Sequence, residues 1–346
     1  IGGRSAIVDE DRGASGDTLF SSADVGSRMG VLGIGHTKTL GENSFLYTNL
    51  SISGNGSGTD YLESQAPGES PLELRHQDDL AKWTLRLSST LNTRISAHHK
   101  LRSGIIVSDE RFRMYSNSFD LDRDRMVVNL DRTGSARTVQ AFSSWKWRMN
   151  EQWSLTLGAR QSWDERLLEA KNFALDTTTL RYGCAMRDEN GVPLPDDACA
   201  REVDEDFDRA TWRAAVNYTP IEDMLIYGSV ATGYRTGGFN GRGTNNFTLQ
   251  PFDEETVLNY ELGHKTDWQL GDIASMRTNL AIYLQQYDDI QKTVSGSNPD
   301  TGAFETFVVN AAEAEIKGVD FDVQIAPTDS LNITLAYAYV DAEYKE

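Results

Sequence analysis

Two cysteines and two adjacent histidines are the residues of this sequence best suited to chemistry. Cys184 and Cys199 lie in one acidic segment. A disulfide between them would close a loop of about 15 residues and constrain it by about 3 kcal/mol in the chain-entropy model. We expect that disulfide as a loop staple, the alternative being two free thiols. His98 and His99 are adjacent and point to opposite faces of a strand, so they are not expected to share a metal ion.

Acidic residues form two clusters of the kind that hard cations use. Asp120, Asp122 and Asp124 alternate in one cluster, and five acids lie between Glu202 and Asp208 in the other. Neither cluster has the glycine and terminal glutamate of an EF-hand loop, which favours a solvated or lipopolysaccharide-facing surface over a Ca²⁺ site. The glycine-rich run 233–241 lacks the Lys and the following helix of a phosphate loop. No metal site and no cofactor are predicted.

Composition narrows the class of protein. The 346 residues carry 33 Lys and Arg against 52 Asp and Glu, a net charge of −19. Without a basic cluster, this charge argues against a nucleic-acid partner, because phosphates are met by Lys and Arg. The longest apolar run, 335–340, is far shorter than the roughly 20 residues of a membrane-spanning helix. The aromatic content of 10% nevertheless predicts a folded chain.

Apolar and polar residues alternate with a period of two along most of the chain. In 82–92, for example, Leu85 and Leu87 share one face while Arg86 and Asn92 share the other. The pattern recurs in 137–148, 153–162, 211–218, 276–285, 318–325 and 331–339. About twelve strands result, several of ten or more residues, against the usual five or six of soluble sheets. Long strands with clean alternation need a different solvent on each face.

The connections between these strands alternate in length. Short turns are predicted at 40–43, 95–98, 149–152, 219–223, 266–272 and 326–330. Long polar segments lie between them, at 54–81, 109–135, 166–208, 235–254 and 294–303. Tight turns at one edge and long loops at the other predict an all-β fold, an antiparallel transmembrane β-barrel. A soluble sandwich with an aromatic core is the alternative.

Several cations are predicted on the inner, lumen-facing side of the barrel. They are Arg86, Arg137, Lys146, Arg148, Arg160, Arg213 and Arg277. Such cations either steer an anionic substrate or pair with lumen carboxylates such as Glu261, Asp320 and Asp322, and the pairing is favoured because barrel interiors are ordinarily polar. On the outer face, Leu85→Arg is expected to cost about 2 to 4 kcal/mol at mid-depth, whereas Arg86→Leu is expected to be tolerated.

Four ordered segments resemble TonB-dependent outer-membrane receptors. They are Tyr227–Gly241, Pro251–Gly263, Tyr287–Gln291, and Asn310–Asp320 followed by Pro327–Asp329. The earlier part of the chain also resembles receptor barrels, through 54–58, 114–116 and 121–126. The resemblance implies a barrel of about 22 strands, plugged by an N-terminal domain that contacts the energy-coupling protein TonB. This plug is the other partner expected for the lumen cations, besides the lumen carboxylates. Neither the plug nor the final strands are recognisable, so we expect 1–346 to be a partial barrel domain, truncated at both ends.

The resemblance also implies a function. It implies energised uptake of a scarce, bulky nutrient across a Gram-negative outer membrane, in contact with lipid and lipopolysaccharide. A ferric siderophore is favoured over cobalamin or an oligosaccharide, and a transporter over an enzyme. Arg235, Phe239 and Asn240 fall where a strand leaves for a loop, so we expect them to face the substrate vestibule. Two alternatives remain for the function. One is a passive porin or adhesin, and the other is an outer-membrane hydrolase that uses Ser96 with His98 or His99.

Overall fold

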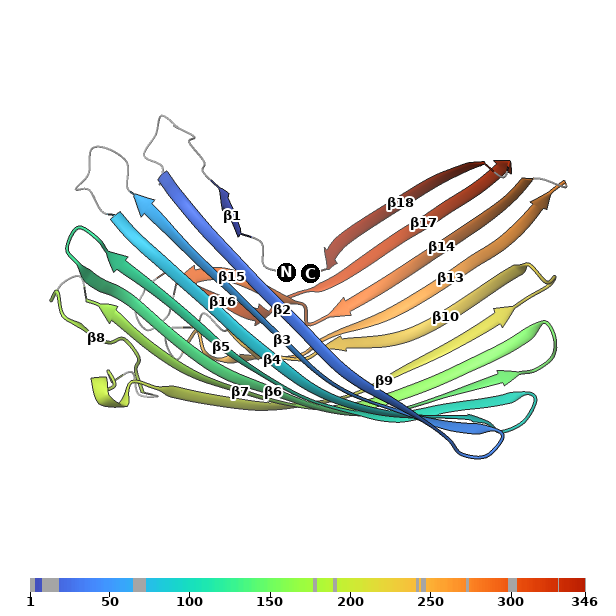
Figure 1. Cartoon of the computed structure of the whole chain (residues 1–346), viewed down its shortest axis with the longest axis horizontal. Helices are drawn as coiled ribbons and strands as arrows, with labels where there is room; N and C mark the ends of the chain where they lie inside the picture. The colour runs from blue at the N-terminus through green and yellow to red at the C-terminus, as the bar shows by residue number, and fades with distance from the viewer. Residues whose placement is uncertain are drawn as a thin grey trace.

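The chain folds as one long antiparallel sheet. The computed structural model describes residues 4–7, 19–64, 73–176, 179–188, 192–240, 243, 247–271, 274–297, 304–328 and 330–345. Nearly all of these residues are in strands, and the main sheet has 14 of them. Each long strand pairs with the long strands before and after it in sequence (Figure 1). Within the described ranges, no helix is long and apolar enough to cross a membrane.

Twelve long strands make up the wall, which confirms the number that the alternation predicts. They are β2 (Leu19–Thr39), β3 (Ser44–Ser64), β4 (Glu73–Arg94), β5 (His99–Asp120), β6 (Arg125–Arg148), β7 (Trp153–Leu175), β9 (Arg201–Tyr218), β10 (Met224–Arg235), β13 (Glu255–Leu270), β14 (Ala274–Asp288), β17 (Glu313–Thr328) and β18 (Leu331–Lys345). The short β1 (Arg4–Ile7) extends one edge beside β2, and β18 is the other edge. Over the residues that are described, these edges do not pair, and Figure 1 shows an open trough.

The wall has an apolar outer face and a polar inner face, because directly paired residues on neighbouring strands point the same way. Leu87, Val107, Val139 and Trp163 are partners across β4 to β7, and all four are exposed on the outer face. The residues between them, such as Asp164, point to the inner face. The segments from the loop edge fold onto this inner face, which makes it the lumen side.

Aromatic side chains gather on the outer face near the turn edge. His99 stacks on Trp145 and Trp147, with ring centroids 5.5 and 6.0 Å apart. Trp153 stacks on Tyr218 at 4.4 Å. Amphipathic rings of this kind are typical of the girdle where a barrel wall meets the membrane boundary.

The loop edge differs from the sequence prediction in three places. The pattern predicts a long loop over 109–135, but β5 and β6 cover nearly all of it and a four-residue turn, 121–124, joins them. Much of 54–81 likewise belongs to β3 and β4, and both ends of 166–208 belong to β7 and β9. Beyond the apolar band both faces of these strands are polar, so hydrophobic alternation stops while the ladder of hydrogen bonds continues. The strands therefore extend well past the band.

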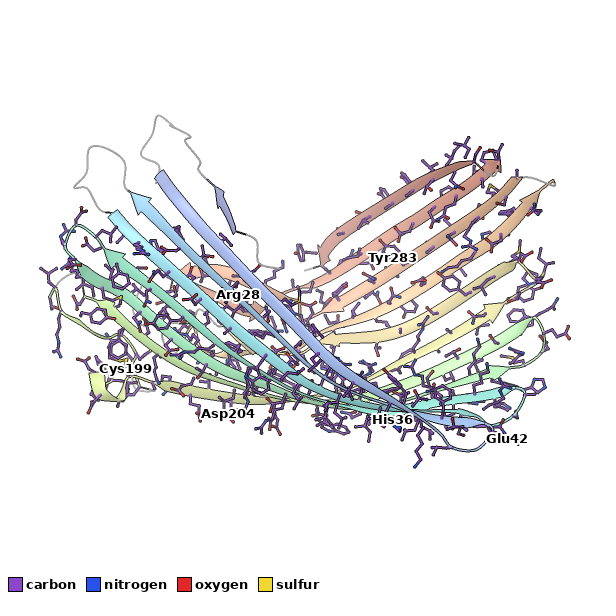
Figure 2. The ribbon with its side chains drawn as sticks, viewed as in Figure 1. Arg28, His36, Glu42, Cys199, Asp204 and Tyr283 are labelled. Atoms are coloured by element: carbon purple, nitrogen blue, oxygen red, sulfur yellow. A yellow bond between two sulfur atoms is a disulfide. The ribbon has the colours of Figure 1, made fainter. Side chains whose placement is uncertain are left out.

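Smaller elements fill the loop edge. They are β8 (Tyr182–Cys184), the 3₁₀ helix η1 (Asp196–Ala198), β11 (Gly238–Phe239), β12 (Pro251–Phe252), β15 (Gln291–Ser297) and β16 (Phe304–Asn310). The dry core of the molecule lies here, and its buried members are Leu168, Ala170, Met186, Cys199 and Leu249. Figure 2 labels Cys199 at this edge and Glu42 at the opposite, turn edge. An apolar core forms only where loops cover the wall, since one layer of sheet cannot bury both of its faces.

Candidate functional site

A cavity of about 350 Å³ lies on the inner face near the loop edge. Its floor comes from the wall, with Glu110 and Phe112 on β5 and Arg166 on β7, and its roof comes from Phe239 and Phe252. The combination of three aromatic rings with one acid and one guanidinium suits a bulky ligand that carries both apolar and charged groups. We treat this cavity as the candidate functional site.

The charged groups of the cavity are held in place by partners on the inner face. Glu110 forms an ion pair with Lys82 at 2.7 Å. Arg166 donates to Asp164 at 3.3 Å, and Asp164 also accepts a hydrogen bond of 2.7 Å from the Tyr234 hydroxyl. Asp164 is only 4% exposed, so its negative charge orients Arg166 from below the cavity. Both charged side chains are therefore preorganised toward a ligand.

The roof is locked onto the wall by close packing and by side-chain amides. A Cβ atom on Gly237 would lie 2.3 Å from the ring of Phe207, so only glycine fits there. Gln291 at the start of β15 donates from Nε2 to the carbonyls of Thr236 and Asp253, both at 3.0 Å. The two ends of the β10 to β13 segment are thereby joined to the neighbouring hairpin.

A fully buried arginine fastens the same segment to β6. Arg132 donates to the Gly243 carbonyl at 2.5 Å, to the Asp131 carbonyl at 3.2 Å and to the Lys171 carbonyl. Arg132 lies toward the loop edge from the outer apolar band, and burial lowers its pKa to about 10. The guanidinium is still charged at neutral pH, and its hydrogen bonds to carbonyls pin the roof.

The three predicted vestibule residues take different positions. Phe239 lines the cavity and packs against the loop-edge core. Asn240 donates from its amide to the Thr306 carbonyl at 3.0 Å, so it ties the roof to β16. Arg235 is exposed at the end of β10 and does not line the cavity.

Sequence reasoning missed three residues of the site, Glu110, Arg166 and the anchoring Arg132. All three lie in segments that the sequence pattern predicts as loops, 109–135 and 166–208, so they were not assigned to a face of a strand. The available signal was alternation among polar residues alone, in which these positions continue the inner-face series of Ser108 and Asp164.

Five of the six predicted lumen arginines lie on the inner face, as does Lys146. Arg86, Arg160 and Arg213 have no carboxylate at ion-pair distance in the described part of the chain, and the Arg160 guanidinium sits 5.8 Å from the Phe142 ring centroid. Arg277 forms an ion pair with Asp267, with one contact of 2.9 Å. Two of the three carboxylates proposed as their partners accept hydrogen bonds from other residues. Glu261 accepts from Tyr227 and Asp322 from Asn279, both at 2.7 Å.

The prediction that Arg137 faces the lumen is wrong. The register of β6 runs unbroken from Arg137 to Val139, and Val139 is exposed on the outer face. Arg137 forms ion pairs with Asp109 at 3.4 Å and with Glu165 at 3.8 Å, its direct partners on β5 and β7. Residues two apart on a strand share a face, which assigns Arg137 to the outside.

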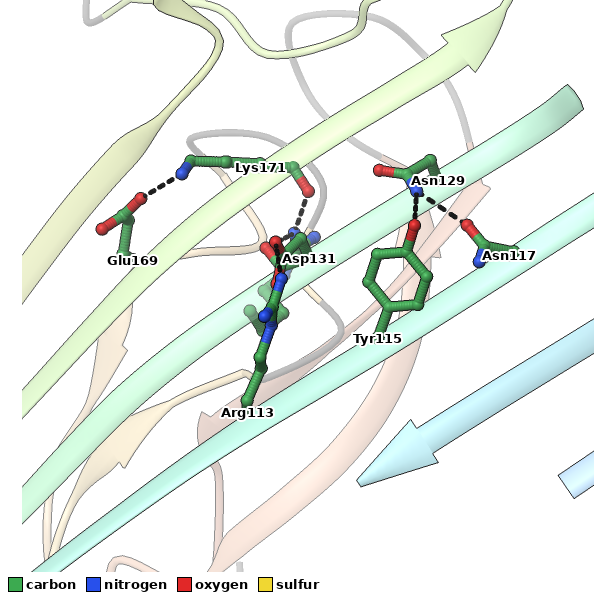
Figure 3. A network of polar contacts seen from close by, with 8 residues as sticks. Arg113, Tyr115, Asn117, Asn129, Asp131, Glu169 and Lys171 are labelled. Carbon is green, nitrogen blue, oxygen red and sulfur yellow. Dashed lines mark hydrogen bonds and ion pairs between the residues drawn. The ribbon is translucent and has the colours of Figure 1, made fainter. Parts of the chain in front are cut away.

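A charged network continues on the outer face toward the loop edge (Figure 3). Arg113 donates to Asp131 at 2.8 Å, and Lys171 pairs with Glu169 at 2.7 Å. Asn129 donates to Tyr115 and Asn117 in the same region, at 2.9 and 2.7 Å. This polar belt marks where the outer face leaves the apolar band.

The acidic clusters and the histidines do not form sites. Within the described ranges, no group of three or more His, Cys, Asp or Glu side chains is arranged to hold a metal ion. Asp120 forms ion pairs with Arg123 and Arg125. The Ser96 hydroxyl accepts hydrogen bonds from the backbone N–H groups of His98 and His99, at 3.1 and 3.2 Å, which makes it a turn cap.

Cys184 and Cys199 form a disulfide with an S–S distance of 2.00 Å. Cys199 is buried in the loop-edge core, and Cys184 packs against that core. Leu249, from the segment that also supplies the cavity roof, belongs to the same core. The disulfide-bonded loop and the roof are therefore parts of one packed unit.

An antiparallel wall of long strands, apolar outside and covered by loops on its polar inner face, defines the class of β-barrel membrane proteins. The family model for the TonB-dependent receptor-like β-barrel matches residues 5–346. The chain belongs to this family, whose members are receptors of the Gram-negative outer membrane.

Two curated relatives illustrate the similarity. The probable TonB-dependent siderophore receptor PiuA of Acinetobacter baumannii is 26% identical over 225 residues, which cover 64% of this chain and 26% of the relative. The ferric-pyoverdine 358 receptor of Pseudomonas putida is 24% identical over 221 residues, or 64% of this chain and 23% of the relative. The matched part thus spans about a quarter of the length of these relatives.

Solved structures show the same fold. The ferric yersiniabactin uptake receptor FyuA of Yersinia pestis superposes with a TM-score of 0.69 at 16% identity, over 94% of this chain and 44% of that receptor. The siderophore receptor PiuA of A. baumannii gives 0.60 at 17% identity, over 93% and 47%. At such identity the likeness concerns the fold alone.

Proposed function

We propose that this chain is barrel wall from an outer-membrane receptor that takes up a ferric siderophore. The observation that carries the proposal is the loop-edge cavity, in which Glu110, Arg166 and three aromatic rings converge beneath a roof tied to the wall. A ferric siderophore is bulky, has apolar or aromatic arms and presents charged oxygens, so it matches this mixture. The names of the curated relatives support the same cargo.

The proposal also includes the membrane and the partner proteins of the receptor. The outer apolar face fits the lipid of the outer membrane, and the charged belt near Arg113 and Asp131 fits lipopolysaccharide headgroups. The matched region is a fraction of each relative, and residues 1–346 serve as part of a larger barrel domain whose plug contacts TonB. Energy from TonB would then drive release of the cargo.

Uptake of radioactive iron by cells that produce the full-length receptor tests this function. Three probes cover the chemistry: a ferric tricatecholate, a ferric trihydroxamate and ferric citrate. We expect saturable uptake of one of them that disappears in a strain lacking TonB. Saturable uptake that persists without TonB, or free leakage of sugars, would refute the proposal in favour of a passive pore.

Substitutions in the cavity connect the transport to this site. Arg166→Gln and Phe239→Ala each remove a contact from a different side of the cavity, and about tenfold weaker uptake at low substrate is expected from one lost charge-assisted or aromatic contact. Arg111→Gln is the matched control, because it removes the same charge at a similar level but on the outer face. Equal effects of Arg166→Gln and Arg111→Gln would rule out the cavity as the binding site.

A further inference from the structure

A groove of about 830 Å³ crosses the outer face of the wall from β9 to β18, and apolar side chains line most of it. One row of direct cross-strand partners follows the groove, formed by Val216, Gly228, Leu262, Ile282, Val319 and Tyr339. Apart from Tyr339 on the edge strand β18, these residues lie on strands that have both neighbours in the described sheet. The wall itself therefore forms the groove, on the side away from the lumen and its plug.

Gly228 leaves a gap in this row. Its direct partners, Val216 on β9 and Leu262 on β13, are both exposed on the outer face. Apart from its chain neighbours, a Cβ atom added to Gly228 would meet no described atom nearer than the Glu261 carbonyl oxygen, at 4.0 Å. An apolar chain that enters this gap contacts side chains on both flanks and the backbone beneath, so it buries more surface than it would on a filled wall.

The groove crosses the apolar band obliquely. Val216 lies two residues from the turn-edge end of β9, whereas Val319 lies nine residues from the turn-edge end of β17. The row thus rises toward the loop edge between β9 and β17, as expected for the tilted strands of a barrel. An apolar chain that follows the row has one end deep in the band at β9 and the other near the loop-side boundary at β17.

Lys317 lies at the β17 end of the groove. The outer face of β17 is apolar from Ile325 to Val319, and Lys317 is the first charged residue on that face toward the loop edge. Eight residues separate Ile325 from Lys317. At a rise of about 3.4 Å and a tilt of about 40°, this distance is about 21 Å in height, close to the apolar band of about 25 Å. Lys317 therefore lies where the headgroups of the extracellular leaflet begin.

The charges around Lys317 leave it free to contact a further anion. Lys317 pairs with Glu315 at 2.6 Å, and Lys345 approaches the same carboxylate at 3.6 Å. Lys345 also pairs with Glu343 at 2.7 Å. An ammonium group carries three N–H donors, so one ion pair leaves donors for a second acceptor. Of these four residues, Lys317 is the one that lines the groove, so the charge beside the apolar row is positive.

We propose that this outer-face groove binds one lipopolysaccharide molecule, with an acyl chain along the row and a lipid A phosphate on Lys317. The loop edge is the extracellular side of such a barrel, and lipopolysaccharide is the phosphate-bearing lipid of that leaflet. An apolar channel that ends at a cation matches a lipid with an anionic headgroup. The site rests on the outer-membrane location in the proposed function, but it involves neither the loop-edge cavity nor the iron cargo.

Native mass spectrometry of the delipidated full-length receptor in detergent tests the proposal, with deep-rough lipopolysaccharide as the probe. We expect one molecule to bind. Gly228→Leu fills the gap and Lys317→Gln removes the cation, and each should weaken binding about tenfold. Removing the phosphates from the probe should weaken binding to the unsubstituted receptor as well. Lys317→Gln should then bring no further loss, because both changes remove the same contact.

Two matched controls repeat these substitutions away from the groove. Gly30→Leu adds the same side chain to an outer-face glycine of β2, where the new Cβ has no described atom within 4 Å. Lys171→Gln removes an outer-face lysine of β7 that pairs at 2.7 Å with Glu169, just as Lys317 pairs with the glutamate two residues before it. Neither control should change binding, and heat-modifiable migration in gels shows whether each variant is folded.

Three results would overturn the proposal. Equal losses in the controls and in the groove variants, or equal binding of the dephosphorylated probe, would assign the groove to bulk lipid. A receptor dimer that Gly228→Leu dissociates would assign it to a second copy of the chain. Iron uptake tests the cargo alone, so a failure of the proposed uptake function is distinguishable from a failure of this site.

Discussion

The outer face of β5 provides a depth scale for the wall. His99 belongs to the turn-edge aromatic cluster, and Asp109 is the first outer carboxylate toward the loop edge. Ten residues separate them. At a rise of about 3.4 Å and a tilt of about 40°, this distance is about 26 Å in height, close to the apolar band of about 25 Å in outer-membrane barrels. Ile105, exposed on the outer face, lies near the middle of that band.

Ile105→Arg is therefore expected to destabilise the wall by about 2 to 4 kcal/mol, the cost of a guanidinium at the centre of the bilayer. Ile106→Arg exchanges the same residue types at the adjacent position, but on the inner face opposite Ser88 and Gln140, and should cost about 1 kcal/mol or less. Leu85→Arg, placed at mid-depth by the sequence, should now cost about 0 to 1 kcal/mol. The register sets Leu85 directly opposite Asp109, at the boundary of the band.

Urea titration of the full-length receptor refolded into lipid vesicles, followed by tryptophan fluorescence, measures these differences. Heat-modifiable gel migration reports assembly of each variant independently. Equal destabilisation by Ile105→Arg and Ile106→Arg would refute the assignment of faces. A cost for Leu85→Arg as large as that for Ile105→Arg would refute the depth scale.

Three further predictions concern the loop edge and the lumen. Replacing Cys184 and Cys199 by Ser should destabilise the loop-edge core by about 3 kcal/mol, seen as faster limited proteolysis between the two positions. Gly318→Ala should cost about 1 to 3 kcal/mol in urea titration, because its Cβ would lie 2.2 Å from the Tyr283 ring. Burial alone raises the pKa of Asp120, but hydrogen bonds from neighbouring arginines outweigh it and lower the pKa overall. The stability that Asp120 contributes is thus present above about pH 4 and lost as the pH falls through the lower folded-state pKa, so Asp120→Asn and the unsubstituted protein should converge in acid.

Matched changes separate these effects from general loss of fold. Gly30→Ala on β2 is the control for Gly318→Ala, because no atom lies within 4 Å of the Cβ it would add. Asp124→Asn is the control for Asp120→Asn, because Asp124 lies in the turn itself and forms no ion pair among the described residues. If Gly30→Ala costs as much as Gly318→Ala, the tyrosine contact is not the cause. A constant gap between Asp120→Asn and the unsubstituted protein across the pH range would contradict the linkage.

Much of the wall could be predicted from the sequence, because alternation with period two is a local property. In stretches such as 82–92, the alternation alone predicts a strand and shows which residues share each face, without information from the neighbouring strands. The failures follow from the same rule. Where both faces become polar, as in 109–135, alternation vanishes although the strand continues, and Glu110 and Arg132 drop out of the predicted site. Arg137 shows the limit on single residues, since its face is fixed by the pairing of β6 with β5 and β7.

The sequence by itself determined the strand periodicity, the sorting of turns and loops, and the family motifs, all of which are written within short windows of residues. Only the tertiary structure decided which distant residues meet. Phe239 lines the same cavity as Glu110 because the loop folds onto the wall, and Lys100 lies between Arg94 and Lys146 because of the strand register. Register is set by how the hydrophobic patterns of two strands match and by the turn that joins them, so the pattern of one strand alone does not fix it. The packing of loops against the wall likewise involves residues that are distant in the sequence.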